Sequence, residues 1–291
     1  MSKRASDDYW DERESPRAIT RPEEFRGGSS VAVFCTQTGL GAAAQRRLVD
    51  EWCSTLPTLN SVTHVWFHSK VPQALFEAAC QMPSVDGIWI KWSGIEDLEP
   101  LSTMKRLSAL HLGSSARITS IDPLVRLPKL KYLNLENLKL IKDLSPLSRL
   151  STLTQLSTTG AFPNTAWEVD SLEPIGELTS LEYFTMGMLR PKSLSLRPLA
   201  GLKRLRFLGL DNRLPMSEYA WLSRRLPNTE CMRFAPYVPV AKSWGIECRK
   251  CKSSKDVVLV TGKGGPHLCT RCDAAKLANH VAAYEEASNA L

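Results

Sequence analysis

The segment Leu127-Pro-Lys-Leu-Lys-Tyr-Leu-Asn-Leu135 carries leucines at the spacing L-x-x-L-x-x-L-x-L. The same apolar ladder recurs along the chain, with weaker copies at both ends, from starts at Leu59, Met82, Met104, Leu150, Leu178, Leu202 and Leu226. Successive ladders start 23, 22, 23, 23, 28, 24 and 24 residues apart. A proline lies between ladders at matching spacings, as Pro100, Pro123, Pro146, Pro174 and Pro198. The apolar ladders and the prolines recur with the same period, and this agreement predicts a chain of stacked repeats.

Each L-x-L step predicts a short strand whose leucines face inward and whose intervening residue faces outward. One unit buries only a few apolar side chains, worth about 1.5 to 3 kcal/mol each. Ordering its backbone costs about 1 to 2 kcal/mol per residue, so a single unit cannot fold alone. Eight stacked copies share one core and, at about 4.8 Å between strands, predict a curved parallel sheet on the order of 35 Å long.

The x-P-L step of each unit resembles the internalin-like subclass of leucine-rich repeats, over roughly residues 59 to 234. The resemblance implies an α/β fold, a leucine-rich-repeat solenoid with a curved parallel β-sheet. The sequence departs from the family where an inward asparagine usually follows each strand. Those positions hold Ser93, Ser115, Leu138, Ala161, Leu189 and Arg213. We therefore expect irregular turns there.

Five segments follow from these patterns: a flexible charged arm at 1–28, a βα cap at 29–58, the repeats at 59–235, a linker at 236–246 and a four-cysteine zinc finger with a C-terminal helix at 247–291. The cap comprises a strand at 31–34 and an amphipathic helix at about 42–56, which cover the first repeat. Its Gly39-x-Gly41 turn lacks a Walker lysine and a third glycine, so it predicts a tight turn and no phosphate site.

The composition is that of an ordinary soluble domain, with 43% hydrophobic and 23% charged residues among 291. No apolar run is long enough for a membrane helix, and the amino terminus has no apolar signal core, so no membrane partner is expected. Four of the eight cysteines form two C-x-x-C pairs and the others show no pairing pattern, which favours a reducing, cytoplasmic location. The net charge of +7 is compatible with nucleic acid or with an acidic protein surface. Nothing in the sequence predicts the oligomeric state.

Outward positions of neighbouring strands line up in columns across the predicted sheet. One column runs through Trp66, Trp89, His111, Asn134, Ser157, Thr185, Gly209 and Arg233, and a second holds Tyr132, Gln155, Tyr183 and Phe207. Large outward aromatics are typical of binding surfaces. The residues predicted to bind a protein partner are Trp66, His68, Trp89, Lys91, His111, Tyr132 and Trp167. The alternative is that the amino-terminal arm folds over the tryptophans.

The unit after Leu156 is longer than its neighbours because of an insertion at 159–170, which includes Phe162, Pro163 and Trp167. Shorter irregular stretches follow at 187–192 and 211–216. These loops leave the same edge of the sheet and predict a rim around a binding face. The alternative is loop variation without a partner, since loops tolerate changes in length.

The strongest chemical motif is C-x2-C-x17-C-x2-C, formed by Cys248, Cys251, Cys269 and Cys272. Four thiolates at this spacing predict one tetrahedral Zn²⁺ with a structural role, because no coordination position is left for water. The residues between the pairs predict a hairpin, and a helix should follow Cys272. We expect the start of that helix to favour the Cys272 thiolate.

This order of knuckle, hairpin and C-x-x-C before a helix resembles a treble-clef finger, and its spacing is similar to that of GATA-type fingers over about 35 residues. The base-contacting pattern of that family after the first knuckle is absent. The resemblance implies nucleic acid as an alternative partner, contacted by Arg249, Lys250, Lys252, Lys263 and Arg271.

No paired carboxylates, no nucleophile with a base and no open metal site emerge, so the sequence predicts a protein without enzymatic activity. We expect an adaptor that binds a protein partner through the concave face and loop rim of the repeats, with the zinc finger as a second docking element. The alternative is a nucleic-acid-associated adaptor whose finger contacts DNA or RNA.

Overall fold

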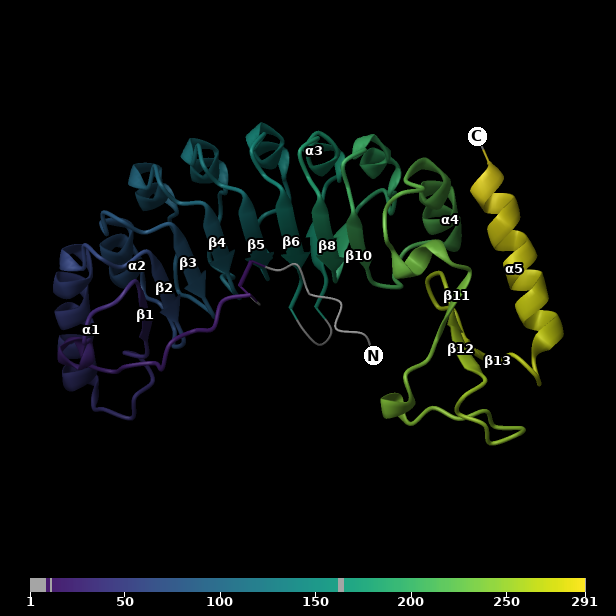
Figure 1. Cartoon of the computed structure of the whole chain (residues 1–291), viewed down its shortest axis with the longest axis horizontal. Helices are drawn as coiled ribbons and strands as arrows, with labels where there is room; N and C mark the ends of the chain where they lie inside the picture. Colours follow the sequence, from purple (N-terminus) through teal and green to yellow (C-terminus); the bar gives the residue numbers. More distant parts are fainter. Residues whose placement is uncertain (1–8, 11, 162–164, 291) are drawn as a thin grey trace.

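The chain forms an arc with strands on its concave side and helices on its convex side (Figure 1). This computed structural model describes residues 9–10, 12–161 and 165–290. Eight parallel strands make one sheet in the order β1-β2-β3-β4-β5-β6-β8-β10, which confirms the predicted solenoid. The strands are β1 (Ser30–Val33), β2 (His64–Phe67), β3 (Gly87–Ile90), β4 (Ala109–Leu112), β5 (Tyr132–Glu136), β6 (Gln155–Thr159), β8 (Tyr183–Gly187) and β10 (Phe207–Leu210).

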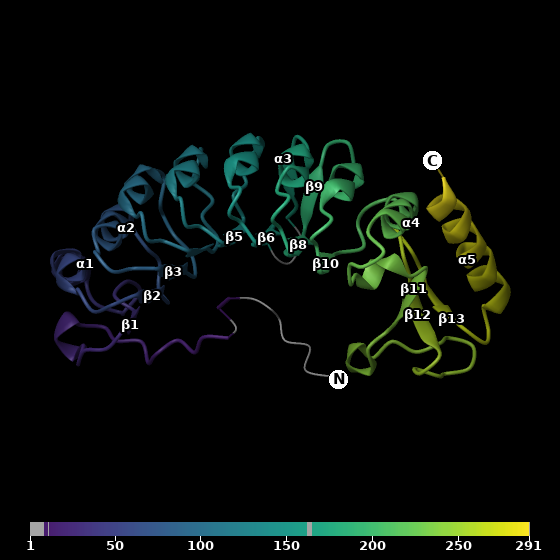
Figure 2. The same ribbon diagram turned by 45° about the horizontal axis from the view of Figure 1, so that its top comes forward.

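Short helical segments return the chain from each strand to the next along the convex side (Figure 2). They are α1 (Ala42–Thr55), the 3-10 helix η2 (Leu56–Thr58), α2 (Gln73–Cys80), η3 (Glu99–Thr103), η4 (Asp122–Arg126), η5 (Ser145–Arg149), α3 (Glu173–Gly176), η6 (Arg197–Gly201) and α4 (Met216–Arg225). The five repeated prolines lie in the first turns of η3, η4, η5, α3 and η6. Proline suits that position because its φ is already helical and its missing N–H would have no partner there.

The strand register agrees with the predicted columns of outward residues. Trp66 pairs with Trp89, Trp89 with His111, and the column continues through Asn134, Ser157, Thr185 and Gly209. The last member was wrong. A bridge joins Phe207 to Glu230, which places Arg233 one residue beyond the column, and its side chain is only 9% exposed.

Hydroxyl groups replace the expected asparagine in two of the turns. Ser93 and Ser115 are buried, their Oγ atoms lie 2.8 Å apart, and the Ser115 hydroxyl donates to the carbonyl of Gly113 over 2.7 Å. The backbone N–H of Ile95 donates to Ser93 Oγ. These turns are therefore linked from unit to unit by a serine pair. Left-handed φ angles at Asn137 (54°) and Met188 (54°) mark the turns that follow β5 and β8.

The insertion after β6 forms secondary structure of its own. Its strand β7 (Trp167–Val169) pairs in parallel with β9 (Leu189–Pro191) from the next unit. The two strands make a second, two-stranded sheet beside the main one. Phe162 and Pro163, which we expected in the rim, lie outside the described residues.

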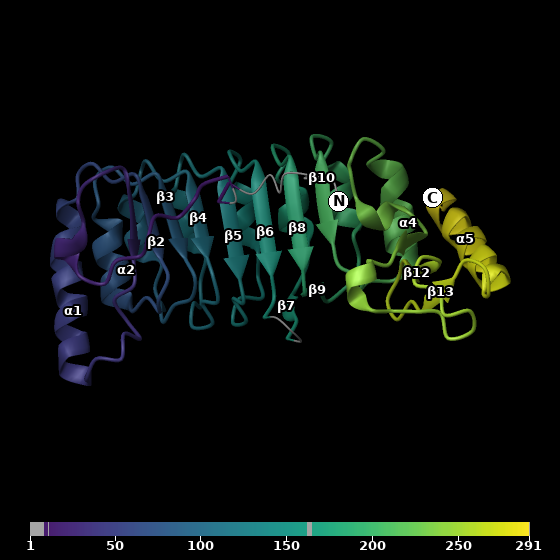
Figure 3. The ribbon, with the colours of Figure 1, turned by 60° about the horizontal axis from the view of Figure 1, so that its bottom comes forward.

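The chain ends in a small antiparallel sheet and a long helix, which continue the arc (Figure 3). Strands β11 (Tyr237–Pro239), β12 (Val257–Val260) and β13 (His267–Cys269) pair in sequence order, and α5 (Ala274–Asn289) follows. The segment expected to be a linker therefore supplies a strand of this sheet, because its backbone pairs with β12. No helix among the described residues combines the length and the apolarity that a membrane span requires.

Candidate binding face and metal centre

Trp66 lies on the concave face as predicted, but it is only 4% exposed. Trp10 of the amino-terminal arm covers it, with ring centroids 5.4 Å apart in an edge-to-face arrangement. Trp10 is itself 8% exposed. Edge-to-face aromatic pairs are favourable because the positive ring edge meets the negative ring face. The expectation of an exposed Trp66 was therefore wrong, and the alternative of an arm that covers this tryptophan was correct. Residues 1–8 and 11 of the arm that we expected to be flexible lie outside the described residues.

Tyr9 extends the same contact across the sheet. Its hydroxyl lies 2.6 Å from Nε2 of His64 on β2, and its ring centroid lies 4.5 Å from that of Tyr132 on β5. The guanidinium of Arg13 stacks over the Tyr9 ring at 3.6 Å and donates to the Tyr9 carbonyl. Burial and the positive charge of Arg13 hold the pKa of His64 below its ordinary value. A neutral His64 can accept the hydroxyl hydrogen of Tyr9.

The rest of the arm attaches to the edge of the sheet. Ser15 Oγ lies 2.7 Å from His68 Nε2, and Ile19 forms a parallel bridge with Val33 of β1. Two backbone hydrogen bonds fix that bridge, one from Ile19 N to the carbonyl of Ala32 and one from Phe34 N to the carbonyl of Ile19. The Trp52 indole donates to the carbonyl of Thr20 over 2.7 Å. The arm is thus an extended polypeptide held on the concave side.

Trp89, His111 and Lys91 lie beside the covered region. The Trp89 ring stacks on His111 at a centroid distance of 5.0 Å, and the His68 ring lies tilted at 5.2 Å. Burial lowers the pKa of His111 to about 4, so this imidazole is neutral near pH 7. The Lys91 ammonium is exposed and lies 4.7 Å from the Trp92 ring centroid. These side chains share one face with Tyr132, as predicted, at the border of the arm.

Trp167 does not belong to the binding face. It is 1% exposed, and its indole N–H donates to the carbonyl of Ile141 over 2.6 Å. The pairing of β7 with β9 turns the ring into the main core. We expected it in an exposed rim, because an insertion gives no sign in the sequence that it will form a strand.

The other half of the concave face has exposed apolar side chains. Phe207 on β10 is 36% exposed and Met232 is 68% exposed. Met232 follows Glu230 by two residues, and Cys231 between them packs into the core, so Met232 faces outward. The segment η8 (Lys242–Trp244) lies on the same side of the arc (Figure 1). Its Trp244 is 60% exposed. We did not expect Tyr9, Met232 and Trp244 on this side of the molecule. For Met232, the sequence did contain a signal, because the alternation of inward and outward residues places this side chain outward.

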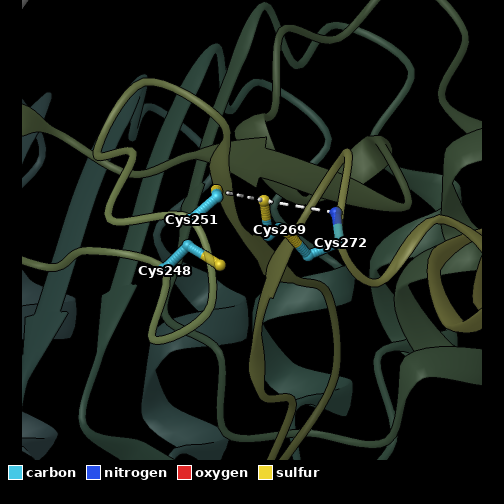
Figure 4. A group of neighbouring side chains, drawn as sticks. All are labelled: Cys248, Cys251, Cys269 and Cys272. Carbon is cyan, nitrogen blue, oxygen red and sulfur yellow. Dashed lines mark hydrogen bonds between the residues drawn. The ribbon is translucent and has the colours of Figure 1, made fainter.

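The four predicted zinc ligands come together at the end of the hairpin (Figure 4). The Sγ atoms of Cys248, Cys251, Cys269 and Cys272 all lie within 4.8 Å of one another, and those of Cys251 and Cys269 are 3.8 Å apart. A tetrahedral zinc with bonds of about 2.3 Å to sulfur needs sulfurs roughly 3.8 Å apart. The cluster therefore fits Zn²⁺ in both ligand type and size.

Hydrogen bonds shift the pKa values of two thiols in this cluster in opposite directions. Backbone N–H groups of Cys251 and Lys250 lower the pKa of Cys248 to about 7. A hydrogen bond with Cys251 raises the pKa of Cys272 to about 12, whereas we expected the start of α5 to lower it. The helix begins two residues later, at Ala274, with Asp273 as its N-cap.

The small sheet is fixed to the last repeat. The side chain of Asn212 donates to the carbonyl of Val260 over 2.9 Å and accepts from Gly262 N over 2.7 Å. The Tyr284 hydroxyl of α5 donates to the carbonyl of Arg233, and α5 packs along α4. Gly262 has φ of 119°, and a Cβ there would lie 2.7 Å from Cβ of Met216. The finger and the repeats are thus in direct contact.

Two of the five cations considered for nucleic acid are in ion pairs. Lys250 pairs with Asp273 at 2.9 Å and Arg271 with Asp256 at 3.7 Å. Arg249, Lys252 and Lys263 are exposed and have no ion-pair partner within the part of the chain that the structure describes. The basic surface of the finger is therefore smaller than its sequence implies.

Solved structures of leucine-rich-repeat proteins share this arrangement of strands and turns. An internalin from Listeria monocytogenes is 22% identical, with 62% of this chain and 56% of that one covered and a TM-score of 0.49. Internalin C2 of the same bacterium is 22% identical, with coverages of 62% and 72% and a TM-score of 0.47. A leucine-rich-repeat protein of Leptospira interrogans is 16% identical, with coverages of 61% and 56% and a TM-score of 0.42. No protein-family model and no curated protein matches the chain.

Proposed function

We propose that this protein is a non-enzymatic adaptor that binds a partner protein through the concave face of its repeats. The observation that carries the proposal is the position of the arm. Tyr9 and Trp10 already rest on that face as part of an extended polypeptide, through aromatic and hydrogen-bond contacts. A face that holds one extended segment in this way can hold another beside it.

The four cysteines support one structural Zn²⁺ in a finger that resembles a treble clef. The cluster would hold the ion entirely with sulfur, and the bound ion would fix the knuckle against the hairpin. The contacts of Asn212 and Tyr284 support a further role, in which the finger closes the end of the repeat stack. The exposed Trp244 and the unpaired cations of the finger support its use as a second docking surface. All eight cysteines are described and none forms a disulfide, which supports a reducing compartment such as the cytoplasm.

Site-specific photo-crosslinking tests the binding face. A photoreactive phenylalanine analogue replaces Tyr183, a half-buried outward residue of β8, and the matched control places it at Leu140, which is 52% exposed and follows β5. The proposal expects a specific protein adduct from Tyr183, resistant to nuclease and absent from Leu140. Equal adducts from both positions, or adducts that vanish with nuclease, would reject it.

A nucleic-acid adaptor is the second candidate, favoured by Arg249, Lys252 and Lys263 on the finger, which are exposed and form no ion pair with another described residue. Cations that contact phosphate release counterions, so binding weakens steeply as salt rises. The measurement is the affinity for labelled DNA and RNA at two salt concentrations, with a triple alanine variant of these residues. A salt-independent affinity or an unaffected variant would exclude this candidate.

A further inference from the structure

The two C-x-x-C turns of the cysteine cluster are each closed by a local hydrogen bond. In the first turn, which starts at Cys248, Lys252 N donates to the Cys248 carbonyl over 2.9 Å. In the second turn, which starts at Cys269, Asp273 N donates to the Cys269 carbonyl over 2.9 Å. These bonds shape each turn but do not set the distance between the turns. Four sulfurs can share one ion only if the two turns are also held against each other.

A lysine of the first turn reaches the second turn. Lys250 Nζ lies 2.9 Å from Oδ1 of Asp273 and donates to the Cys272 carbonyl over 3.2 Å. The other carboxylate oxygen of Asp273 accepts from Cys269 N over 3.1 Å. Asp273 is the N-cap of α5, yet its side chain makes no capping hydrogen bond within the described part of that helix. Its carboxylate instead joins the two cysteine turns.

A second ion pair runs in the opposite direction. Arg271 of the second turn lies 3.7 Å from Oδ2 of Asp256. The same oxygen accepts over 2.7 Å from the hydroxyl of Ser253, which follows the first turn. The Asp256 carbonyl accepts from Thr270 N over 2.8 Å. Lys250 and Arg271 both stand directly before the second cysteine of their turn, so cations at equivalent positions link the turns twice.

Charge and burial favour the Lys250 link in particular. Four thiolates around one Zn²⁺ carry a net negative charge, which a nearby cation stabilises. An exposed ion pair by itself contributes little. The Asp273 side chain, however, is only 18% exposed, and its carboxylate is shared by two donors from different turns. Such a shared carboxylate fixes where the two turns lie relative to each other.

We propose that Lys250 and Asp273 form a clamp that positions the two cysteine pairs for zinc. Arg271 and Asp256 form a second clamp, which is weaker because its ion pair is longer. This inference rests on the zinc site of the proposed function. It assigns Lys250 and Arg271 to the metal centre, although the sequence suggested that both contact phosphate. Removing a group that orients metal ligands costs about 10- to 100-fold in metal affinity.

The zinc affinity of the full chain, measured by competition with a chelator of known affinity, tests the clamp. Lys250→Met should bind zinc about tenfold more weakly or worse. Lys250→Arg keeps a cation that can reach Asp273 and should bind more tightly than Lys250→Met. Arg249→Met is the matched control, because it removes an exposed cation of the same turn that forms no ion pair with another described residue. This control should change the affinity much less.

A double variant tests whether the two residues act as a pair. Asp273→Asn keeps an oxygen that can accept from Cys269 N but removes the charge that Lys250 contacts. Lys250→Met/Asp273→Asn should therefore bind zinc no more weakly than the weaker single variant, whereas independent losses would add. Saturated with Co²⁺, each variant should keep the absorption spectrum of four sulfur ligands, because the clamp positions the cysteines and replaces none of them.

Wild-type zinc affinity in Lys250→Met, an equal loss in Arg249→Met, or additive losses in the double variant would each overturn the clamp. A Lys250→Met chain with unchanged zinc affinity but weaker binding to labelled DNA or RNA would also overturn it, since Lys250 would then contact phosphate. A wild-type chain that binds no zinc would reject the metal site of the proposed function together with this inference. One zinc ion bound equally well by wild type and Lys250→Met would reject the clamp alone.

Discussion

The Tyr9 hydroxyl lies 2.6 Å from Nε2 of His64, although 55 residues separate the two in the chain. The opposite ring nitrogen, Nδ1, lies 2.9 Å from the hydroxyl of Thr63. A neutral imidazole serves both, with Nδ1–H donating to Thr63 and Nε2 accepting from Tyr9. The arm is therefore held by a contact that depends on the protonation state of one histidine.

Acid should release the arm. Burial and the Arg13 guanidinium hold the pKa of His64 below the ordinary 6.5, against the opposing charge of Asp86. Because the docked state favours neutral imidazole, the stabilisation is fully present above about pH 6.5 and is lost as pH falls toward the docked-state pKa. Burial lowers the pKa of His68, which contacts Ser15, in the same direction.

Hydrogen exchange of residues 12–20 measures this release as a function of pH, after correction for the intrinsic exchange rate. In His64→Phe, the part of the pH dependence of exchange that His64 causes should disappear. A wild-type response that persists unchanged in this variant and in His68→Phe would show that neither histidine controls the arm.

Trp10→Ala should undock the arm without unfolding the repeats. The substitution removes the ring that covers Trp66, and loss of a buried tryptophan typically costs about 3 to 5 kcal/mol where the site cannot collapse. Because the arm is peripheral, the loss should appear as faster exchange of residues 12–20 and a red shift of tryptophan emission. Trp244→Ala, at a site that is 60% exposed, is the control and should change neither exchange nor the melting temperature.

Trp167→Phe should destabilise the repeats rather than a partner complex. The ring is 1% exposed, and its indole N–H is a donor to the Ile141 carbonyl. Removing that donor leaves a buried carbonyl without its partner, at a cost of about 1 to 3 kcal/mol. Urea unfolding should show the loss. An unchanged urea midpoint together with weaker partner binding would mean that Trp167 belongs to the binding face after all.

Zinc removal should destabilise the end of the repeat stack as well as the finger. Mass spectrometry under native conditions should find one zinc ion per wild-type chain and none in Cys269→Ser, while Cys53→Ser, outside the cluster, should retain it. Structural zinc contributes about 10 to 16 kcal/mol in isolated finger peptides. Exchange should therefore increase in α4, against which α5 packs, and around Asn212 and Arg233, which are hydrogen-bonded to the finger and to α5. Protection that remains unchanged there would mean that the finger does not close the stack.

The sequence determined the repeat fold and the four-cysteine cluster because both are set by local spacing. Leu133 and Leu135 face inward because alternate side chains of a strand lie on one face, and the same spacing recurs in the other units. The repeat period alone brings Trp66, Trp89 and His111 into one column. The two C-x-x-C turns each present two sulfurs to one point, so spacing again suffices.

Only the tertiary structure decided what covers these surfaces. Tyr9 and Trp10 dock on strands more than 50 residues away, which no periodic pattern encodes. Trp167 is buried because its insertion pairs with β9, and the supposed linker is a strand because it pairs with β12. These contacts join segments that are distant in the chain, and their free energy depends on which surfaces the folded arc brings together. A sequence pattern indicates that a side chain faces outward, whereas the folded arc alone determines whether another segment lies on top of it.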